Sequence, residues 1–188
     1  NVSLAMDGRN RAFLLAGDCL YVADPEGRLV AALPGTKLKA EFYEGSGCLL
    51  EGEEGSIYYS PGDYFNVVYE LTGDDVAFRG ESFRMKRIEL PSGSGICCSS
   101  SRGLLCSGSG LLYRYRKDDS CWEPLLRYGD SNLPSEPEEI LQLSDNRIAV
   151  YYSYPYDTLY AMEKNEVSRL PEKEVLVLAA GNFSSELE

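Results

Sequence analysis

Residues 11–33, RAFLLAGDCLYVADPEGRLVAAL, contain three short apolar runs separated by two compact polar segments. The runs occupy residues 11–16, 19–24 and 28–33, and the segments between them are Gly17-Asp18 and Pro25-Glu26-Gly27. Glycine, proline and aspartate favour tight turns, and runs of about six residues are too short for ordinary helices. This stretch therefore predicts three antiparallel strands joined as a meander.

The same plan recurs along the rest of the chain. Strand-like runs follow at residues 48–51, 55–60 and 65–71, at 95–99, 104–107, 111–116 and 122–128, and at 140–143, 147–154, 158–162 and 167–170. Tyr21, Tyr58, Tyr113 and Tyr160 align as residues of the third strand, 37, 55 and 47 positions apart. These intervals bracket the period of roughly 40 to 50 residues that is typical of propeller blades. Residues 72–90, inside the longest interval, leave room for an extra hairpin or a decorated loop.

These repeats predict an all-β fold of β-propeller-like repeats, each a four-stranded antiparallel meander. We expect about four blades, which form either a small closed ring or a segment of a larger or open propeller. The blades are expected near residues 1–36, 37–90, 91–134 and 135–171. One meander cannot bury both of its faces, whereas blades stacked face to face can, and tyrosine supplies apolar area for that packing. A β-sandwich has the same short strands and turns and is the alternative; the repeated turn-Leu-Tyr pattern favours blades.

The composition restricts the partners of the chain. Its 188 residues are 44% hydrophobic, which is ample for a buried core. Lys plus Arg number 18 against 30 Asp plus Glu, so the formal charge is −12 and nucleic-acid binding is disfavoured. No apolar run approaches the roughly 20 residues that span a bilayer, so we expect no direct membrane insertion. Because residue 1 is Asn rather than Met, the sequence reads as a processed or trimmed piece.

The six cysteines lack the regular spacing of a disulfide framework. They are Cys19, Cys48, Cys97, Cys98, Cys106 and Cys121. Each stands in or beside a strand-like run, where a free thiol packs as a small apolar group, so we expect most of them to be reduced. A bridge from Cys97 or Cys98 to Cys106 is the alternative, because these residues flank a short segment that would join neighbouring strands.

No constellation of catalytic residues is recognisable. The chain has no histidine, which removes Ser-His-Asp and Cys-His catalysis and histidine-containing zinc sites. Nucleotide-binding glycine loops and serine-nucleophile motifs are also missing from the sequence, so we expect no enzyme activity, no cofactor and no metal. Adjacent carboxylates occur at residues 53–54, 74–75, 118–119 and 138–139. Acids in turns are usually solvated, so a glycosidase built on such loop carboxylates is only an alternative.

Aromatic side chains supply the candidate ligand-binding residues. Tyr154 and Tyr156 stand at the end of a tyrosine-rich run that Pro155 interrupts, where they could stack on a sugar ring or a partner protein. Trp122 is a third candidate, at the start of a strand. Packing between blades is the competing interpretation for all three, and the sequence favours it.

From Gly110 onward the sequence resembles a known group of proteins. The resemblance rests on LLYRY at 111–115, residues 122–126, RYGDSNL at 127–133 and LSDNRI at 143–148. These are similar to the propeller-like region that precedes the sugar-type extracellular solute-binding domain in ABC-transporter lipoproteins of Gram-positive gut bacteria. The resemblance implies an extracellular location, anchoring at the cell surface through the parent protein, and contact with a transporter permease through that protein.

The end of the chain differs from the repeats. The run KEVLVLAAG at 173–181 is continuously apolar, like a strand buried on both faces of an α/β sheet. Residues 182–188 then suit a turn and the first turn of a helix. The resemblance identifies residues 172–188 as a linker strand and the start of a following solute-binding domain.

The sequence therefore predicts a non-enzymatic binding or interaction domain, accessory to a surface lipoprotein that takes up nutrients, with a protein partner or a sugar as ligand. A carbohydrate-binding or carbohydrate-active propeller, using loop carboxylates and exposed tyrosines, is the alternative.

Overall fold

The fold is built almost entirely from short antiparallel strands. A computed structural model describes residues 2–38, 42, 47–61, 66–73, 83–91, 94–98, 103–127, 137, 139–142, 147–152, 158–163 and 166–169. Within this part of the chain the strands form four sheets of four strands each. The expected all-β class is therefore confirmed.

Each sheet is a meander, in which every strand pairs antiparallel with its neighbours in sequence. The first sheet comprises β1 (Val2–Met6), β2 (Ala12–Ala16), β3 (Cys19–Ala23) and β4 (Leu29–Pro34), and the second β5 (Cys48–Glu51), β6 (Ile57–Ser60), β7 (Val67–Thr72) and β8 (Arg84–Glu89). The third comprises β9 (Ser94–Cys98), β10 (Leu105–Gly108), β11 (Leu111–Arg116) and β12 (Cys121–Arg127), and the fourth β13 (Glu139–Gln142), β14 (Ile148–Tyr152), β15 (Thr158–Glu163) and β16 (Glu166–Arg169). The short helix α1 (Gly35–Leu38) and the 3-10 turn η1 (Glu53–Gly55) complete the assigned elements.

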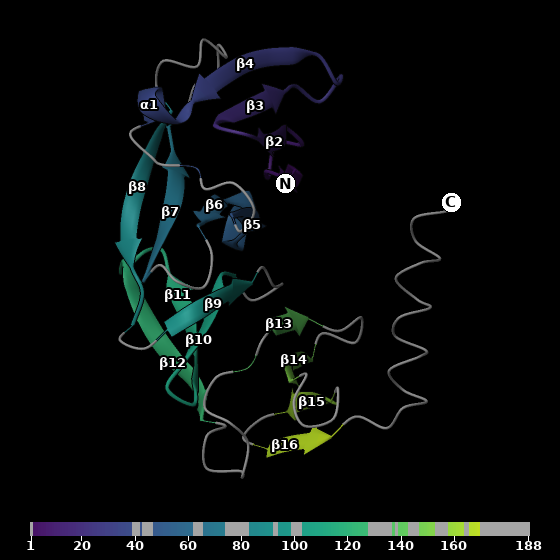
Figure 1. Cartoon of the computed structure of the whole chain (residues 1–188), viewed down its shortest axis with the longest axis vertical. Helices are drawn as coiled ribbons and strands as arrows, with labels where there is room; N and C mark the ends of the chain where they lie inside the picture. Colours follow the sequence, from purple (N-terminus) through teal and green to yellow (C-terminus); the bar gives the residue numbers. More distant parts are fainter. Residues whose placement is uncertain are drawn as a thin grey trace, which may run out of the picture.

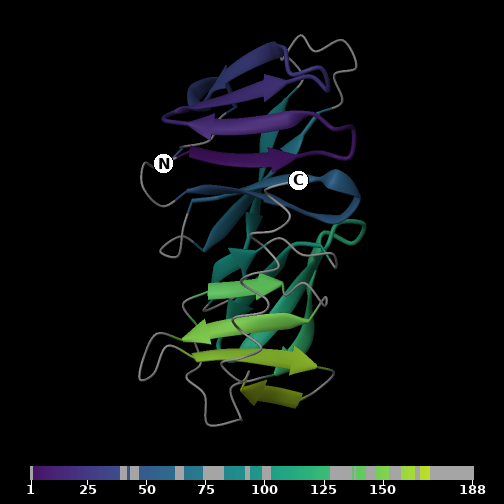
Figure 2. The ribbon, with the colours of Figure 1, turned by 90° about the vertical axis from the view of Figure 1, so that its right-hand side faces the viewer.

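The four sheets follow one another along an open arc (Figure 1). The first strand of each sheet lies on the inner side of the arc and the last strand on the outer side. Figure 2 shows the first and fourth sheets at the two ends of this stack. The first strands begin at residues 2, 48, 94 and 139, intervals of 46, 46 and 45 residues. One sheet thus recurs at an almost constant interval.

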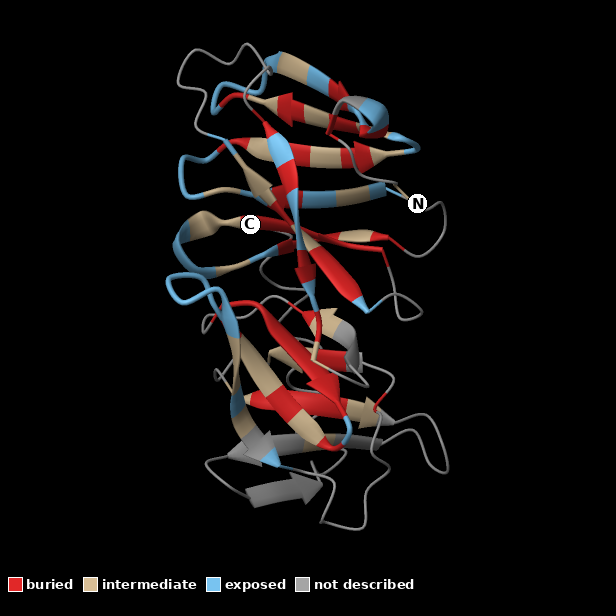
Figure 3. Cartoon of the chain, turned by 90° about the vertical axis from the view of Figure 1, so that its left-hand side faces the viewer, coloured by how far each residue is buried: buried red, intermediate tan, exposed pale blue. Residues whose placement is uncertain are grey.

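Three apolar cores fill the spaces between successive sheets. Between the first and second sheets, buried residues such as Phe13 and Leu20 pack against Leu49 and Tyr59. Similar clusters join the second sheet to the third and the third to the fourth. Buried residues alternate with half-buried ones along β2 and β3 of the first sheet, whereas all four residues of β6 and of β10 in the internal sheets are buried (Figure 3). Each internal sheet is therefore covered on both faces by its neighbours.

Most of the predicted strands are confirmed, but two strands were missed. Residues 1–10 were not assigned to a strand, whereas β1 is the first strand of its sheet. The prediction of an extra hairpin or decorated loop at residues 72–90 is wrong for residues 84–89, which form β8, the fourth strand of the second sheet. In β8 only Met85 and Ile88 are buried, Met85 in the core shared with the first sheet and Ile88 in the core shared with the third, and the four exposed polar side chains concealed the strand.

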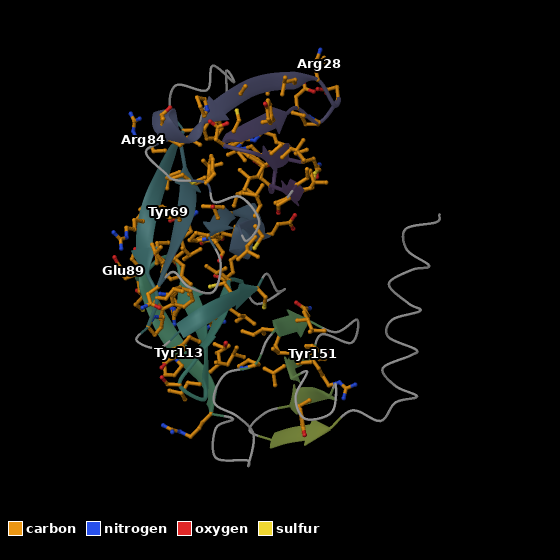
Figure 4. The ribbon with its side chains drawn as sticks, viewed as in Figure 1. Arg28, Tyr69, Arg84, Glu89, Tyr113 and Tyr151 are labelled. Carbon is orange, nitrogen blue, oxygen red and sulfur yellow. The ribbon has the colours of Figure 1, made fainter. Side chains whose placement is uncertain are left out.

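The alignment of the tyrosines was also wrong at one position. Tyr58 lies in β6, the second strand of its sheet, and the third strand β7 carries Tyr69 instead. With Tyr69 in place of Tyr58, the third-strand tyrosines Tyr21, Tyr69, Tyr113 and Tyr160 lie 48, 44 and 47 residues apart. Figure 4 labels Tyr69 and Tyr113 in successive sheets. The corrected repeat is more regular than the expected one.

Candidate functional site

An open cleft of about 720 Å³ lies where the first and second sheets meet. The turn before β2 and the turn before β6 form two of its walls, and the β11–β12 turn of the third sheet contributes Lys117. Its lining consists of Asp7, Gly8, Arg9, Arg11, Phe13, Glu54, Gly55, Ser56, Ile57, Glu70, Leu71, Thr72, Gly73, Phe83, Lys86 and Lys117. Charged and hydroxyl-bearing side chains from three sheets therefore meet in one cleft.

A rigid turn between β1 and β2 places Asp7 and Arg11 at the cleft. Asp7 Oδ1 accepts hydrogen bonds from the main-chain N–H groups of Arg9 and Arg11, both at 2.9 Å, and Asp7 Oδ2 accepts one from Arg11 Nε at 2.5 Å. Asn10 closes the turn with a positive φ of 59°. Asp24 and Arg28 repeat these bonds between β3 and β4, with Gly27 in the position of Asn10. The sequence D-x-x-x-R thus specifies this turn twice.

The Arg11 side chain is held between two aromatic rings. Its guanidinium carbon lies 5.6 Å from the centroid of the Phe13 ring and 5.5 Å from that of the Phe83 ring. The ion pair with Asp7 is buried as well, so both charged groups are removed from solvent together. Phe13 and Phe83 are buried and already in contact with Arg11, so they serve as packing for a cation rather than as an open platform for a ligand.

Glu70 is the most buried charged residue among those described in the cleft. Glu70 lies in β7 with 3% of its surface exposed, and its Oε1 is 3.1 Å from Lys117 Nζ. Lys117 Nζ also donates a hydrogen bond to Ser56 Oγ at 2.9 Å. Residues of the second and third sheets are joined at this point by one ion pair and one hydrogen bond.

The buried side chain of Tyr58 lies beside Glu70. It pairs with Glu70 across β6 and β7, and its ring meets that of Tyr115 in the third sheet with centroids 6.1 Å apart. Burial, together with the negative charge of Glu70, raises the pKa of the Tyr58 phenol well above its ordinary value. The phenol therefore stays protonated and can serve as a hydrogen-bond donor next to the carboxylate.

The charge of the cleft differs in sign from the charge of the whole chain. Among the described residues that line it, four carry a positive charge (Arg9, Arg11, Lys86 and Lys117) and three carry a carboxylate (Asp7, Glu54 and Glu70). The difference, 4 − 3, is +1, whereas the complete chain carries −12. A negatively charged ligand would therefore meet less repulsion from these side chains than the charge of −12 on the whole chain alone would suggest.

Of the three predicted ligand-binding residues, the structure describes one. Trp122 is half-buried at the start of β12, its ring lies 5.1 Å from the ring of Tyr115, and its Nε1 donates a hydrogen bond to the Glu89 carbonyl oxygen at 2.8 Å. These contacts place Trp122 between the second and third sheets, and it is not among the residues that line the cleft. Tyr154 and Tyr156 lie outside the described residues, as do residues 172–188 with the predicted linker strand.

The carboxylate pairs and cysteines are distributed over several elements. Glu53 and Glu54 form part of η1, and Asp118 and Asp119 lie exposed in the β11–β12 turn. All six cysteines are free thiols, and Cys97 faces Cys106 across β9 and β10. Within the described part of the chain, no cluster of three or more such residues is arranged to hold a metal ion.

Sequence reasoning did not identify the polar residues of the cleft. Glu70 had a visible signal, because it is the one charged residue in the apolar run at residues 67–71. The repeated D-x-x-x-R pattern was a signal for Asp7 and Arg11. Lys117 had none, since its neighbours in sequence indicate only an exposed turn and its partner Glu70 is 47 residues away.

In the described ranges, no helix has the length and apolar character needed to cross a membrane. No family model matches this chain, and no curated protein matches its sequence. Among solved structures, the chain is similar to the crystal structure of a protein of unknown function from Bacteroides caccae, with a TM-score of 0.46 and 10% sequence identity. The similarity covers 91% of this chain and 60% of that chain, so this chain spans less than two thirds of the other protein's length.

Proposed function

We propose that this chain is a propeller-like, non-enzymatic binding module whose cleft takes a hydroxyl-rich, acidic ligand such as a uronic acid. Support for the propeller-like arrangement comes from four consecutive meanders that recur every 45 or 46 residues and have their first strands on the inner side of an arc. Support for a binding role comes from the concentration of polar groups from three sheets in one cleft.

The observation that carries the ligand assignment is the ion pair between Lys117 and Glu70, with Ser56 beside it. An ammonium group and a carboxylate can donate to and accept from adjacent hydroxyls, which is the pattern that a sugar ring presents. The net charge of +1 over the described residues of the cleft favours a sugar that also carries a carboxylate.

A non-enzymatic role is supported by the pairing of the cleft acids. Glycoside hydrolysis requires two carboxyl groups across the bond, one to donate a proton and one to attack or to activate water. Among the three described carboxylates of the cleft, Asp7 is engaged by Arg11 and Glu70 by Lys117, so only Glu54 stands outside these two ion pairs. Both carboxylates are thereby held in structural ion pairs, and the chain has no histidine to replace either of them.

The wider setting in this proposal is the one that the sequence resemblance implies. The module would belong to a surface-anchored solute-binding lipoprotein outside the cell and would meet a transporter permease through that parent protein. Its part in uptake would be to capture a sugar or to contact a protein partner.

The proposal is tested by isothermal titration calorimetry of the chain with sodium glucuronate, with glucose for comparison. We expect glucuronate to bind more tightly than glucose, and Lys117→Met to weaken glucuronate binding by about tenfold, the loss typical of one charge-assisted contact. Arg87→Met is the matched control, since Arg87 forms an exposed ion pair with Glu89 on β8 and does not line the cleft. The proposal would be contradicted if Lys117→Met and Arg87→Met bound glucuronate equally well. It would also be contradicted if the wild type released reducing sugar from oligouronides.

A further inference from the structure

Two cysteines face each other within the third sheet. Cys97 in β9 and Cys106 in β10 are direct cross-strand partners in an antiparallel pairing. The side chains of such partners share one face of the sheet, and their Cα atoms lie about 4.5 or 5.5 Å apart. Disulfide bonds join residues whose Cα atoms are about 4.4 to 6.8 Å apart. The backbone therefore holds Cys97 and Cys106 at the spacing of a disulfide, although both are thiols in this structure.

The packing of the sheets decides which of the two adjacent cysteines of β9 belongs to this pair. Neighbouring residues of a strand point to opposite faces of the sheet. Cys97 and Cys106 both pack in the core between the second and third sheets. Cys98 packs with its own cross-strand partner, Leu105, in the core between the third and fourth sheets. Cys98 is therefore on the other face of the sheet from Cys106.

The strand register sets this pair apart from the other cysteines. Within the described strands, Cys97 and Cys106 are the only cysteines that have a cysteine as their cross-strand partner. Opposite Cys19 lie Ala16 and Pro34, opposite Cys48 lies Ser60, and opposite Cys121 lies Arg116.

The two thiols of the pair differ in their access to solvent. Cys97 is half-buried, whereas Cys106 has 0% of its surface exposed. A dissolved oxidant therefore meets Cys97 first. Cys106 is reached from Cys97, its neighbour across the strands, and not from the solvent.

We propose that Cys97 and Cys106 are a redox site that forms one reversible intramolecular disulfide, with a small disulfide such as oxidised glutathione as the oxidant. The Cys97 thiolate attacks one sulfur of the oxidant, whose S–S bond breaks and releases one glutathione thiol. The Cys106 thiol then loses its proton and attacks Cys97 Sγ, which releases the second glutathione thiol. In total the two cysteines lose two protons and two electrons, and the oxidant gains them as two thiols.

The bond would join two strands of the third sheet at the core that this sheet shares with the second. It would close a ring from residue 97 to residue 106 and so reduce the conformational freedom of the unfolded chain, which stabilises the fold. The disulfide would persist in an oxidising compartment and open in a reducing one. The inference does not depend on the ligand of the cleft.

The test is oxidation of the native full chain in mixtures of oxidised and reduced glutathione, followed by acid quenching, alkylation of the remaining thiols and digestion with trypsin. Trypsin cuts after Arg87, Arg102 and Arg114, so the two cysteines fall on separate peptides, 88–102 and 103–114. We expect these peptides to be linked, with a yield that does not depend on protein concentration, and to separate in dithiothreitol. Fragmentation of the main chain between residues 97 and 98 shows which cysteine carries the bond.

Two alanine variants provide a matched comparison. Cys97→Ala should abolish the linked peptides, whereas Cys98→Ala, one position along the same strand, should keep them. Oxidation should raise the urea midpoint of the wild type and of Cys98→Ala by roughly 1 M and leave that of Cys97→Ala unchanged. The peptide link in the wild type needs no variant, so it tests the proposal even if Cys98→Ala does not fold.

The proposal would be overturned if peptides 88–102 and 103–114 of the native wild type stayed separate in oxidised glutathione. A bond carried by Cys98 instead of Cys97, or a link whose yield rises with protein concentration, would overturn it equally.

Discussion

Trp122 donates a hydrogen bond from its indole Nε1 to the carbonyl oxygen of Glu89, 2.8 Å away, and so ties the third sheet to the end of β8 in the second. The same ring packs against Tyr115, which lies in the core between these two sheets. The bond uses the one polar atom of the side chain. Trp122 thus links the second and third sheets.

Replacement of Trp122 should measure how much this hydrogen bond contributes to the stability of the fold. Trp122→Phe keeps much of the ring contact but removes the N–H donor, so we expect the free energy of unfolding to fall by about 1 kcal/mol, the usual net value of one hydrogen bond. Urea denaturation followed by tyrosine fluorescence measures the change. A variant as stable as the wild type would show that the bond contributes nothing.

The close approach of two turns at the cleft predicts a difference between two glycines. Gly55 has a φ of +70°, and a Cβ on it would lie 1.9 Å from the Gly8 nitrogen. Gly27 has a φ of +78°, but a Cβ there would meet nothing within 4 Å. Gly27→Ala should therefore cost about 1 kcal/mol of unfolding free energy for the left-handed conformation alone, and Gly55→Ala clearly more. Equal losses in urea denaturation would contradict the observed contact.

The turn at Asp24 predicts a pH-dependent contribution to stability. Burial alone would raise the pKa of Asp24, but hydrogen bonds from the Arg28 main chain and side chain outweigh it and hold the pKa below the ordinary 3.8. A carboxylate with a lowered pKa stabilises the fold above its unfolded-state pKa, and this stability is lost as the pH falls through the folded-state pKa. Asp24→Asn should therefore have a lower urea midpoint than the wild type at pH 7, with a smaller difference below pH 3.8.

The control for this pH series is Asp118→Asn, in the exposed β11–β12 turn. Its urea midpoint should follow that of the wild type at both pH values. A difference for Asp24→Asn that stays constant down to the most acidic pH would show that the carboxylate charge is not what stabilises the turn.

The cysteines should differ widely in their reaction with iodoacetamide. Cys121 is exposed on β12, whereas Cys98 is buried, and burial raises the pKa of the Cys98 thiol to about 12. Since the thiolate is the reactive form, Cys121 should be modified first and Cys98 only when the protein unfolds. Peptide mass spectrometry at timed intervals at pH 8 gives the order. Rapid modification of Cys98 in the native protein would mean that the core between the third and fourth sheets opens readily.

Alternation and turn chemistry were enough to predict the strands of the first, third and fourth sheets, with the exception of β1. The missed strand β8 shows the limit, because Met85 and Ile88 are its only buried residues and the exposed Arg84, Lys86, Arg87 and Glu89 hide the pattern. Figure 4 shows Arg84 and Glu89 on the outer side of the arc. Local sequence also could not decide between Tyr58 and Tyr69, because both follow apolar residues. Their assignment depends on the pairing of β6 with β7.

The cleft was less predictable than the fold. The ion pair between Glu70 and Lys117 joins a strand of the second sheet to a turn of the third, and only the stacking of the sheets brings them together. The Asp7–Arg11 turn was predictable in principle, since the Asp24–Arg28 turn repeats its pattern and its hydrogen bonds. A search for short repeated turn motifs would have found it.

The most direct test of the binding role is an NMR titration of the isotope-labelled chain with sodium glucuronate, following the backbone amides. If the cleft is the site, the chemical-shift changes should concentrate at Gly8, Ser56 and Lys117, and Lys117→Met should need about tenfold more glucuronate to reach the same changes at Gly8 and Ser56. Shifts confined to residues away from the cleft, such as Tyr151, or no shifts at millimolar glucuronate, would contradict the proposed function.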